Sequence, residues 1–223
     1  MKTFDLLRKN GTKIENEYNF TNGKNLGIIF SGFAYTYKNP LLYYSRNILF
    51  DHNIDYFGID YKYYDDTFFE KMNEQEQNIY FEEDKDIIIN KIIEINNNYN
   101  KLILIGKSIG TCIIKKCINN KILRDKAIII LITPAVEWEQ IIDEIKNINN
   151  PILVIGSLKD KHYCVKNLGE IYNRNNIDIY EIKEGDHSLE INDAIKDIEQ
   201  LKNIMGKINT IIEINMRIFA PKL

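Results

Sequence analysis

The sequence predicts an α/β protein in which a mostly parallel sheet carries helices on both faces. Short runs of branched apolar residues, such as Leu102–Ile105, alternate along the chain with segments of helical periodicity. Small or polar residues follow each run, as expected where a chain leaves a buried strand. We therefore expect about seven or eight strands, and we expect residues 1–223 to form a single domain.

Each element has a local signal. Residues 3–20 are typical of an antiparallel N-terminal hairpin with Asn10 and Gly11 in its turn. Asn39 and Pro40 suit the N-cap and first position of a helix that we expect to end near Phe50. The remaining expected strands are 26–30, 54–61, 102–105, 127–132, 152–156 and 177–182, and the remaining expected helices are 79–96, 109–119, 137–147, 163–173 and 191–205.

The segments between and after these elements are also informative. Residues 62–78 read as a polar loop rich in aromatic side chains, and Gly206 is expected to end the final helix. Residues 207–223 are apolar enough to pack on the core, but no element is assigned to them. The connection between the strand 127–132 and the helix 137–147 is too short to hold a lid domain.

Composition excludes several classes of function. The net charge of -3 comes without a basic patch, so we expect no nucleic-acid partner. Cys112, Cys117 and Cys164 have no C-x-x-C spacing, which disfavours both a zinc site and a disulfide framework, and we expect no metal. The start lacks an apolar signal segment and no run approaches a membrane span, which predicts a cytoplasmic protein without membrane contact.

The pattern G-x-S-x-G at residues 106–110 stands between the strand 102–105 and a helical segment. A strand, a tight turn and a helix are the context of a nucleophile elbow, which exposes the hydroxyl of Ser108. Gly106 and Gly110 are needed because a side chain at either position would collide with neighbouring backbone. A phosphate-binding P-loop would require a glycine at position 101, which is Lys101, and a loop where the apolar strand lies.

Two partners for Ser108 follow later strands. Asp160 follows the strand 152–156 and His187 follows the strand 177–182, so the order along the chain is Ser, Asp, His. The carboxyl ends of parallel strands meet at one edge of a sheet, where ligands bind. Imidazole can activate a serine hydroxyl near neutral pH, and a carboxylate on its other nitrogen orients it.

Other residues are weaker candidates for these roles. Glu137, after the strand 127–132, is the alternative acid. His52 lies at the amino end of the sheet and is expected on the surface, and His162 in the loop of Asp160 either lines the pocket or faces solvent. Lys107 is expected to be solvated, and Cys112 is expected to pack in the interior of its helix.

An oxyanion hole requires two backbone N–H groups beside the nucleophile. Ile109 would provide one, because it follows Ser108 at a helix N-terminus, and Phe33 or Ala34 would provide the other from the loop after the strand 26–30. Loop aromatics either wall a shallow open pocket or pack on the core; these are Tyr35, Tyr37, Tyr63, Tyr64, Phe68 and Phe69.

With these motifs together, the chain resembles the α/β-hydrolase superfamily over about residues 26–205, and most of all its small, capless, dienelactone-hydrolase-like bacterial members. The resemblance rests on residues 28–33, 106–110, 156–160 and 185–190. It implies a serine triad, an oxyanion hole and esterase-like chemistry without a cofactor. The sequence departs from the pattern twice. Ser31 stands where a histidine often precedes the glycine of the oxyanion loop, and Ser108 stands where dienelactone hydrolases have cysteine.

The sequence thus supports two hypotheses of function. The first is a serine hydrolase that cleaves a small carboxylic ester or thioester through an acyl-enzyme intermediate. The second is a catalytically inactive protein of the same fold that binds a ligand or partner through the same pocket. The identity of the acyl and leaving groups, and whether the protein is a monomer or a homodimer, stay open at this point.

Overall fold

The computed structural model describes residues 1–134, 137–163 and 165–217. These residues form a seven-stranded sheet in the order β1-β3-β2-β4-β5-β6-β7. All neighbouring strands are parallel except β1, which pairs antiparallel with β3. The strands are β1 (Glu15–Asn19), β2 (Asn25–Phe30), β3 (Asp55–Asp60), β4 (Lys101–Lys107), β5 (Ala127–Ile132), β6 (Ile152–Ser157) and β7 (Ile177–Ile182).

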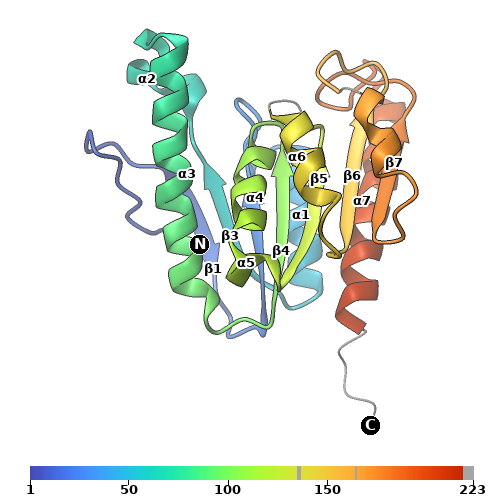
Figure 1. Ribbon diagram of the computed structural model, residues 1–223, viewed down its shortest axis with the longest axis horizontal. Helices are drawn as coiled ribbons and strands as arrows, with labels where there is room; N and C mark the ends of the chain where they lie inside the picture. Colours follow the sequence, from blue (N-terminus) through green and yellow to red (C-terminus); the bar gives the residue numbers. More distant parts are fainter. Residues whose placement is uncertain (135–136, 164, 218–223) are drawn as a thin grey trace.

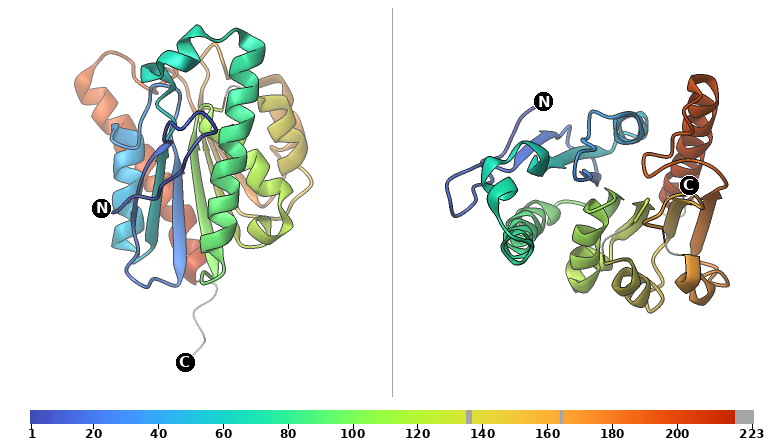
Figure 2. Two further views of the ribbon diagram at one scale, coloured as in Figure 1. Left: turned by 90° about the vertical axis from the view of Figure 1, so that its left-hand side faces the viewer. Right: turned by 90° about the horizontal axis from the view of Figure 1, so that it is seen from above.

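Helices cover both faces of the sheet, as Figure 1 and the view from above in Figure 2 show. One face carries α3, α4 and α6, and the opposite face carries α1 and α7. The α-helices are α1 (Pro40–Asp51), α2 (Thr67–Lys71), α3 (Glu74–Asn96), α4 (Gly110–Asn119), α5 (Lys121–Arg124), α6 (Trp138–Ile145) and α7 (Ala194–Arg217), and the short 3₁₀ helices are η1 (Tyr63–Asp65) and η2 (Val165–Glu170).

The central strand β4 shows why the apolar runs are continuous. Leu102 and Leu104 pack on the face of α3 and α4, whereas Ile103 and Ile105 pack on the face of α1 and α7. Successive strand residues point to opposite faces, so a strand covered on both sides is apolar at every position. The predicted fold class is confirmed, and the predicted strands correspond to β2–β7 with ends that differ by at most two residues.

The N-terminal arms form a looser hairpin than predicted. Lys2 pairs with Tyr18 and Leu7 with Lys13 as isolated antiparallel bridges, and the regular strand β1 pairs with β3. The turn at Asn10 and Gly11 is present, and Gly11 adopts a φ of 83° that favours glycine.

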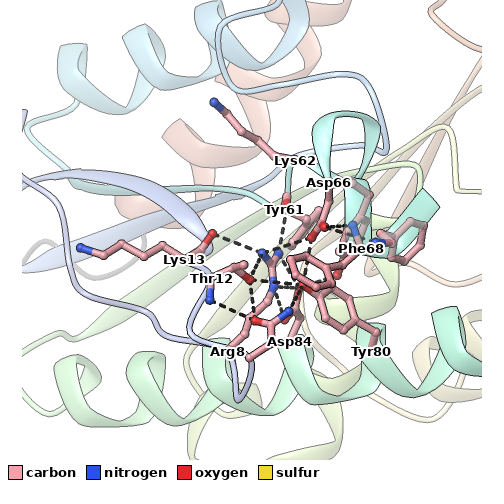
Figure 3. A network of polar contacts seen from close by, with 12 residues as sticks. Arg8, Thr12, Lys13, Tyr61, Lys62, Asp66, Phe68, Tyr80 and Asp84 are labelled. Carbon is pink, nitrogen blue, oxygen red and sulfur yellow. Dashed lines mark hydrogen bonds and ion pairs between the residues drawn. The ribbon is translucent and has the colours of Figure 1, made fainter. Parts of the chain in front are cut away.

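A buried polar network joins this hairpin to the rest of the fold (Figure 3). Arg8 Nε lies 2.9 Å from Asp84 Oδ1 on α3, and Arg8 Nη2 donates to the carbonyl oxygen of Tyr61 at 2.8 Å. The hydroxyl of Tyr63 in η1 donates to Asp84 Oδ2 at 2.7 Å. The side chains of Arg8 and Asp84 are only 5% and 1% exposed, so the pair anchors the hairpin within the protein.

Three predictions about helices were wrong. Residues 62–78 are not one loop, because they contain η1 and α2, and α3 already begins at Glu74. Its N-terminus has a capping box in which Asn73 and Glu76 exchange hydrogen bonds, a signal that lies in polar residues rather than in apolar periodicity. The helix predicted at 163–173 is instead the short η2.

The final helix also differs from its prediction. It begins at Ala194 and continues through Gly206 to Arg217, so the glycine does not end it. Ile208 and Ile212 are fully buried, and this apolar stripe holds the extension of α7 against the sheet. Residues 218–223 of the C-terminal segment lie outside the described residues.

The connections on the carboxyl edge of the sheet are short. Strand β5 ends at Ile132 and α6 begins at Trp138, so the connection leaves no room for the lid domain that the sequence also excluded. No helix in the described part of the chain combines the length and apolar content that crossing a membrane requires.

Candidate active site

Ser108 occupies a sharp turn between β4 and α4. Its φ of 52° lies in the left-handed region, which is uncommon for a residue with a side chain. A Cβ atom at Gly110 would lie 2.4 Å from the carbonyl oxygen of Phe30, and one at Gly106 would lie 2.8 Å from Ile114 Cδ1. The glycines thus let the turn approach β2 and α4 closely, as the G-x-S-x-G pattern predicts.

The side chains of Ser108, His187 and Asp160 form a continuous chain of hydrogen bonds. His187 Nε2 lies 2.8 Å from Ser108 Oγ, and His187 Nδ1 lies 2.7 Å from Asp160 Oδ2. The residues come from the loops that follow β4, β6 and β7, at one edge of the sheet. The structure therefore brings together the three residues that the strand ends singled out.

The partners of His187 determine where its ring proton lies. An ionised carboxylate only accepts hydrogen bonds, so Nδ1–H donates to Asp160 and Nε2 is left to accept from the hydroxyl of Ser108. Burial and then the positive charge of Lys107 lower the pKa of His187 below 6.5, although Asp160 acts in the opposite direction. The imidazole is therefore neutral at pH 7 and able to take up a proton.

The loop of Asp160 holds its carboxylate in place. The side chain is fully buried, and Oδ1 accepts the backbone N–H of His162 at 2.9 Å while Oδ2 faces His187. The alternative acid Glu137 instead lies 2.9 Å from Lys85 Nζ and 2.5 Å from Lys115 Nζ, so helices α3 and α4 hold both of its oxygens. Asp160 is thus the acid that contacts the histidine.

Comparison with known proteins supports the fold. No family model and no curated protein sequence matches the chain. Among solved structures, the chain is similar to Est1E from Butyrivibrio proteoclasticus with bound ferulic acid, at 10% identity, a TM-score of 0.67, and coverage of 95% of this chain and 98% of that one. It is also similar to the Pyrococcus furiosus esterase Pf2001, at 10% identity, a TM-score of 0.63 and coverage of 95% and 91%.

A third similar structure is alpha/beta hydrolase domain-containing protein 10 from mouse, at 12% identity, a TM-score of 0.59, and coverage of 90% of this chain and 93% of that one. Each of the three alignments covers at least 90% of both chains. The chain has the α/β-hydrolase fold. The fold alone does not determine the reaction, so activity has to be argued from the site.

In this α/β-hydrolase fold, the candidate oxyanion donors come from the segments that follow β4 and β2 at the carboxyl edge of the sheet. Ile109 precedes the first residue of α4, and Phe33 and Ala34 lie in the loop after β2. Within the described residues, no hydrogen bond occupies the backbone N–H groups of Ile109, Phe33 or Ala34. The N–H of Gly32 is already used, because it donates to the carbonyl oxygen of Tyr35 at 2.8 Å.

Lys107 is buried, contrary to the expectation from the sequence. The sequence suggested a solvated side chain, but Lys107 is 1% exposed, and its Nζ donates to Thr133 Oγ1 at 2.5 Å and to the carbonyl oxygen of His187 at 2.7 Å. Burial lowers its pKa to about 7. Strand alternation could have revealed this, because Lys107 shares the parity of the buried Ile103 and Ile105.

The loop aromatics divide into three groups. Tyr35 borders a cavity of about 140 Å³ together with Leu41, Leu189 and Ile204. Tyr37 and Tyr63 are each 3% exposed and pack in the interior, which is the second of the two possibilities that the sequence left open. Phe69 is also buried, whereas Tyr64, Phe68 and the oxyanion-loop residue Phe33 are exposed.

The other histidines and Cys112 have different surroundings. The exposed His162 ring lies 5.2 Å from the His187 ring, so it borders the site. His52, expected on the surface, is half-buried at the end of α1, and its Nε2 lies 2.8 Å from Asn209 Oδ1. Cys112 is buried as expected, and burial raises its pKa to about 12. Within the described residues, no group of His, Cys, Asp or Glu side chains is arranged to hold a metal ion.

Proposed function

We propose that the protein is a serine hydrolase that cleaves a small carboxylic ester or thioester. The observation that carries the proposal is the unbroken hydrogen-bond chain from Ser108 through His187 to Asp160. A serine hydroxyl is a weak nucleophile at neutral pH, and an adjacent imidazole base overcomes this weakness. The similarity in fold to two esterases agrees with this chemistry.

Acylation begins when Ser108 Oγ attacks the substrate carbonyl and His187 Nε2 takes the hydroxyl proton. Asp160 stabilises the resulting imidazolium through Nδ1–H. The backbone N–H of Ile109 and that of Phe33 or Ala34 bind the developing oxyanion. His187 then gives its proton to the leaving alkoxide or thiolate, and an acyl group remains on Ser108.

Deacylation repeats these steps with water as the nucleophile. His187 Nε2 removes a proton from water, which attacks the acyl carbonyl, and the same N–H groups bind the second oxyanion. The proton then returns to Ser108 Oγ as the acid leaves. No metal or cofactor takes part in the proposed cycle.

The alternative of an inactive binding protein lacks a supporting observation. A separation of Ser108 Oγ and His187 Nε2 beyond hydrogen-bond reach would have favoured it, whereas these atoms lie 2.8 Å from each other. The buried carboxylate of Asp160 and the left-handed backbone of Ser108 are also costly features that a passive pocket does not need.

Labelling with a fluorophosphonate probe tests the proposal directly. We expect the wild type to be labelled and Ser108→Ala to be unlabelled. Ser188→Ala is the matched control, because Ser188 lies beside His187 but outside the hydrogen-bond chain. Equal labelling of the wild type and Ser108→Ala would refute the mechanism. A chain-length series of p-nitrophenyl esters with acyl thioesters alongside would then define the acyl and leaving groups.

A further inference from the structure

Lys107 is a buried amine that the proposed reaction cycle does not use. It is the residue immediately before the nucleophile, and its side chain is directed to the α1 and α7 side of the sheet. Taking an ammonium group out of water is costly unless hydrogen bonds and charges compensate. Such a residue at the centre of a site therefore calls for a functional explanation.

The contacts of Lys107 connect three segments of the site. Its Nζ donates to Thr133 Oγ1 at the end of β5 and to the backbone carbonyl of His187 in the loop after β7. Thr133 is itself fully buried, and its N–H donates to the carbonyl oxygen of Ile155 in β6 at 2.7 Å. The lysine thus ties the segment that carries the base to the strand that carries the nucleophile.

The His187 loop reaches across the sheet to Ser108. His187 follows β7, and strands β5 and β6 stand between β7 and β4 in the sheet. At about 4.8 Å per strand spacing, the loop must span roughly 14 Å to reach Ser108. Ser157 Oγ donates to the carbonyl of Gly185 at 2.7 Å, which holds the start of the loop, and Lys107 holds His187 itself.

Lys107 also shapes the electrostatics of the site. Its charge lowers the proton affinity of His187, which Asp160 raises and His162 lowers. Asp160 and Asp186 in turn favour the charged form of Lys107, and the ring of Tyr35 lies 5.3 Å from its Nζ. Lysine and imidazole therefore compete for positive charge within one cluster.

We propose that Lys107 is a positioning residue for the proposed hydrolysis, and that its Nζ holds the His187 loop at the nucleophile while its charge keeps the His187 ring neutral before substrate attack. This inference rests on the proposed function, since it assigns the base role to His187. The tether requires a hydrogen-bond donor at position 107, whereas the electrostatic effect requires a positive charge there.

Two variants separate these effects. Lys107→Gln retains a donor without a charge, and Lys107→Met retains neither. We expect the acid limb of the pH profile of kcat/KM to move to higher pH in both variants, by on the order of half a pH unit. The reason is that the positive charge at position 107 no longer repels the imidazolium of His187. We expect kcat to fall about 10- to 100-fold in Lys107→Met, because the base is misplaced, and several-fold less in Lys107→Gln.

Thr133→Val is the matched control, because it removes one acceptor of Lys107 and leaves the charge. Its acid limb should stay at the wild-type position. Thermal unfolding of each variant checks that it is folded.

An acid limb that stays at its wild-type pH in both Lys107 variants overturns the inference, even if kcat falls, because a packing defect alone would lower kcat. Equal losses of kcat in Lys107→Met and Lys107→Gln overturn it as well, since the donor would then have no role. A Ser108→Ala variant as active as the wild type would instead overturn the proposed function, so the two failures are distinguishable.

Discussion

His187 Nε2 lies 2.8 Å from Ser108 Oγ, although the two residues are 79 positions apart in the chain and their strands are separated in the sheet by β5 and β6. The contact therefore exists only in the folded protein. It depends on the backbone turn at Ser108, on the buried Asp160 and on the tether from Lys107. Each of these supports can be removed by a single substitution.

Replacing Asp160 by Asn should abolish the base function of His187 while the fold persists. The amide can donate to Nδ1, which favours the tautomer with its proton on Nε2, so that Nε2 faces Ser108 Oγ as a donor and cannot take up the hydroxyl proton. We expect kcat for ester hydrolysis to fall by about 10³- to 10⁴-fold. Glu137→Gln, a change of the other candidate acid, should retain near wild-type kcat, and a reversed pattern would transfer the role of the acid to Glu137.

Replacing Gly110 by Ala should destabilise the elbow. The new Cβ atom would meet the Phe30 carbonyl oxygen at 2.4 Å, so β2 and α4 would have to separate. We expect the free energy of unfolding to fall by about 3 kcal/mol, as measured by urea denaturation. Gly206→Ala in α7 is the control, because the new Cβ atom meets no atom within 4 Å. This substitution should raise the free energy of unfolding by about 0.5 to 1 kcal/mol. If both substitutions lowered the free energy of unfolding by similar amounts, the explanation by steric contact at Gly110 would be wrong.

Replacing Arg8 by Met should weaken the attachment of the N-terminal hairpin to α3. The substitution leaves the carboxylate of Asp84 buried without its ion-pair partner, and we expect a loss of about 3 to 5 kcal/mol of unfolding free energy. Lys13→Ala removes an exposed pair with Asp5, and we expect little change in the free energy of unfolding. If the two variants had equal stability, the buried network of Figure 3 would not anchor the hairpin.

Lys107 should make stability depend on pH. In the unfolded chain its pKa is near 10.5, whereas in the folded protein it is about 7. Between these values the unfolded state binds more protons, so the free energy of unfolding should rise with pH, by up to about 1.4 kcal/mol per unit. Denaturation at pH 7, 8 and 9 should show this rise in the wild type. In Lys107→Met, the free energy of unfolding should lack this contribution to the rise with pH. The same dependence of unfolding free energy on pH in the two proteins would contradict the assignment of the rise to Lys107.

The strands could be predicted because their signal is local. Each parallel strand is buried on both faces, which demands an unbroken apolar run, and residues such as Ile28 and Ile129 provide it. The positions of Ser108, Asp160 and His187 followed from the strands, since parallel strands present their carboxyl ends at one edge. Segments with polar signals were harder, as α2 and the start of α3 at the Asn73 cap show.

The burial of individual side chains could not be predicted from local sequence patterns. Tyr37 and Tyr63 are loop aromatics of the kind that can line a pocket, yet contacts with distant segments bury them. Lys107 was expected in water because ammonium groups usually are. Only the approach of Thr133 and the His187 carbonyl provides the acceptors that make its burial tolerable.

Local patterns in the chain thus specified the alternation of strands and helices and the chemical groups at the strand ends, because backbone propensity and two-sided burial act over a few residues. The tertiary structure decided which of those groups meet. It carried His187 across two strands to Ser108, paired Arg8 with Asp84, and enclosed Lys107 between β4, β5 and the loop after β7. These contacts join segments far apart in sequence, so their energies depend on the packing of the whole sheet.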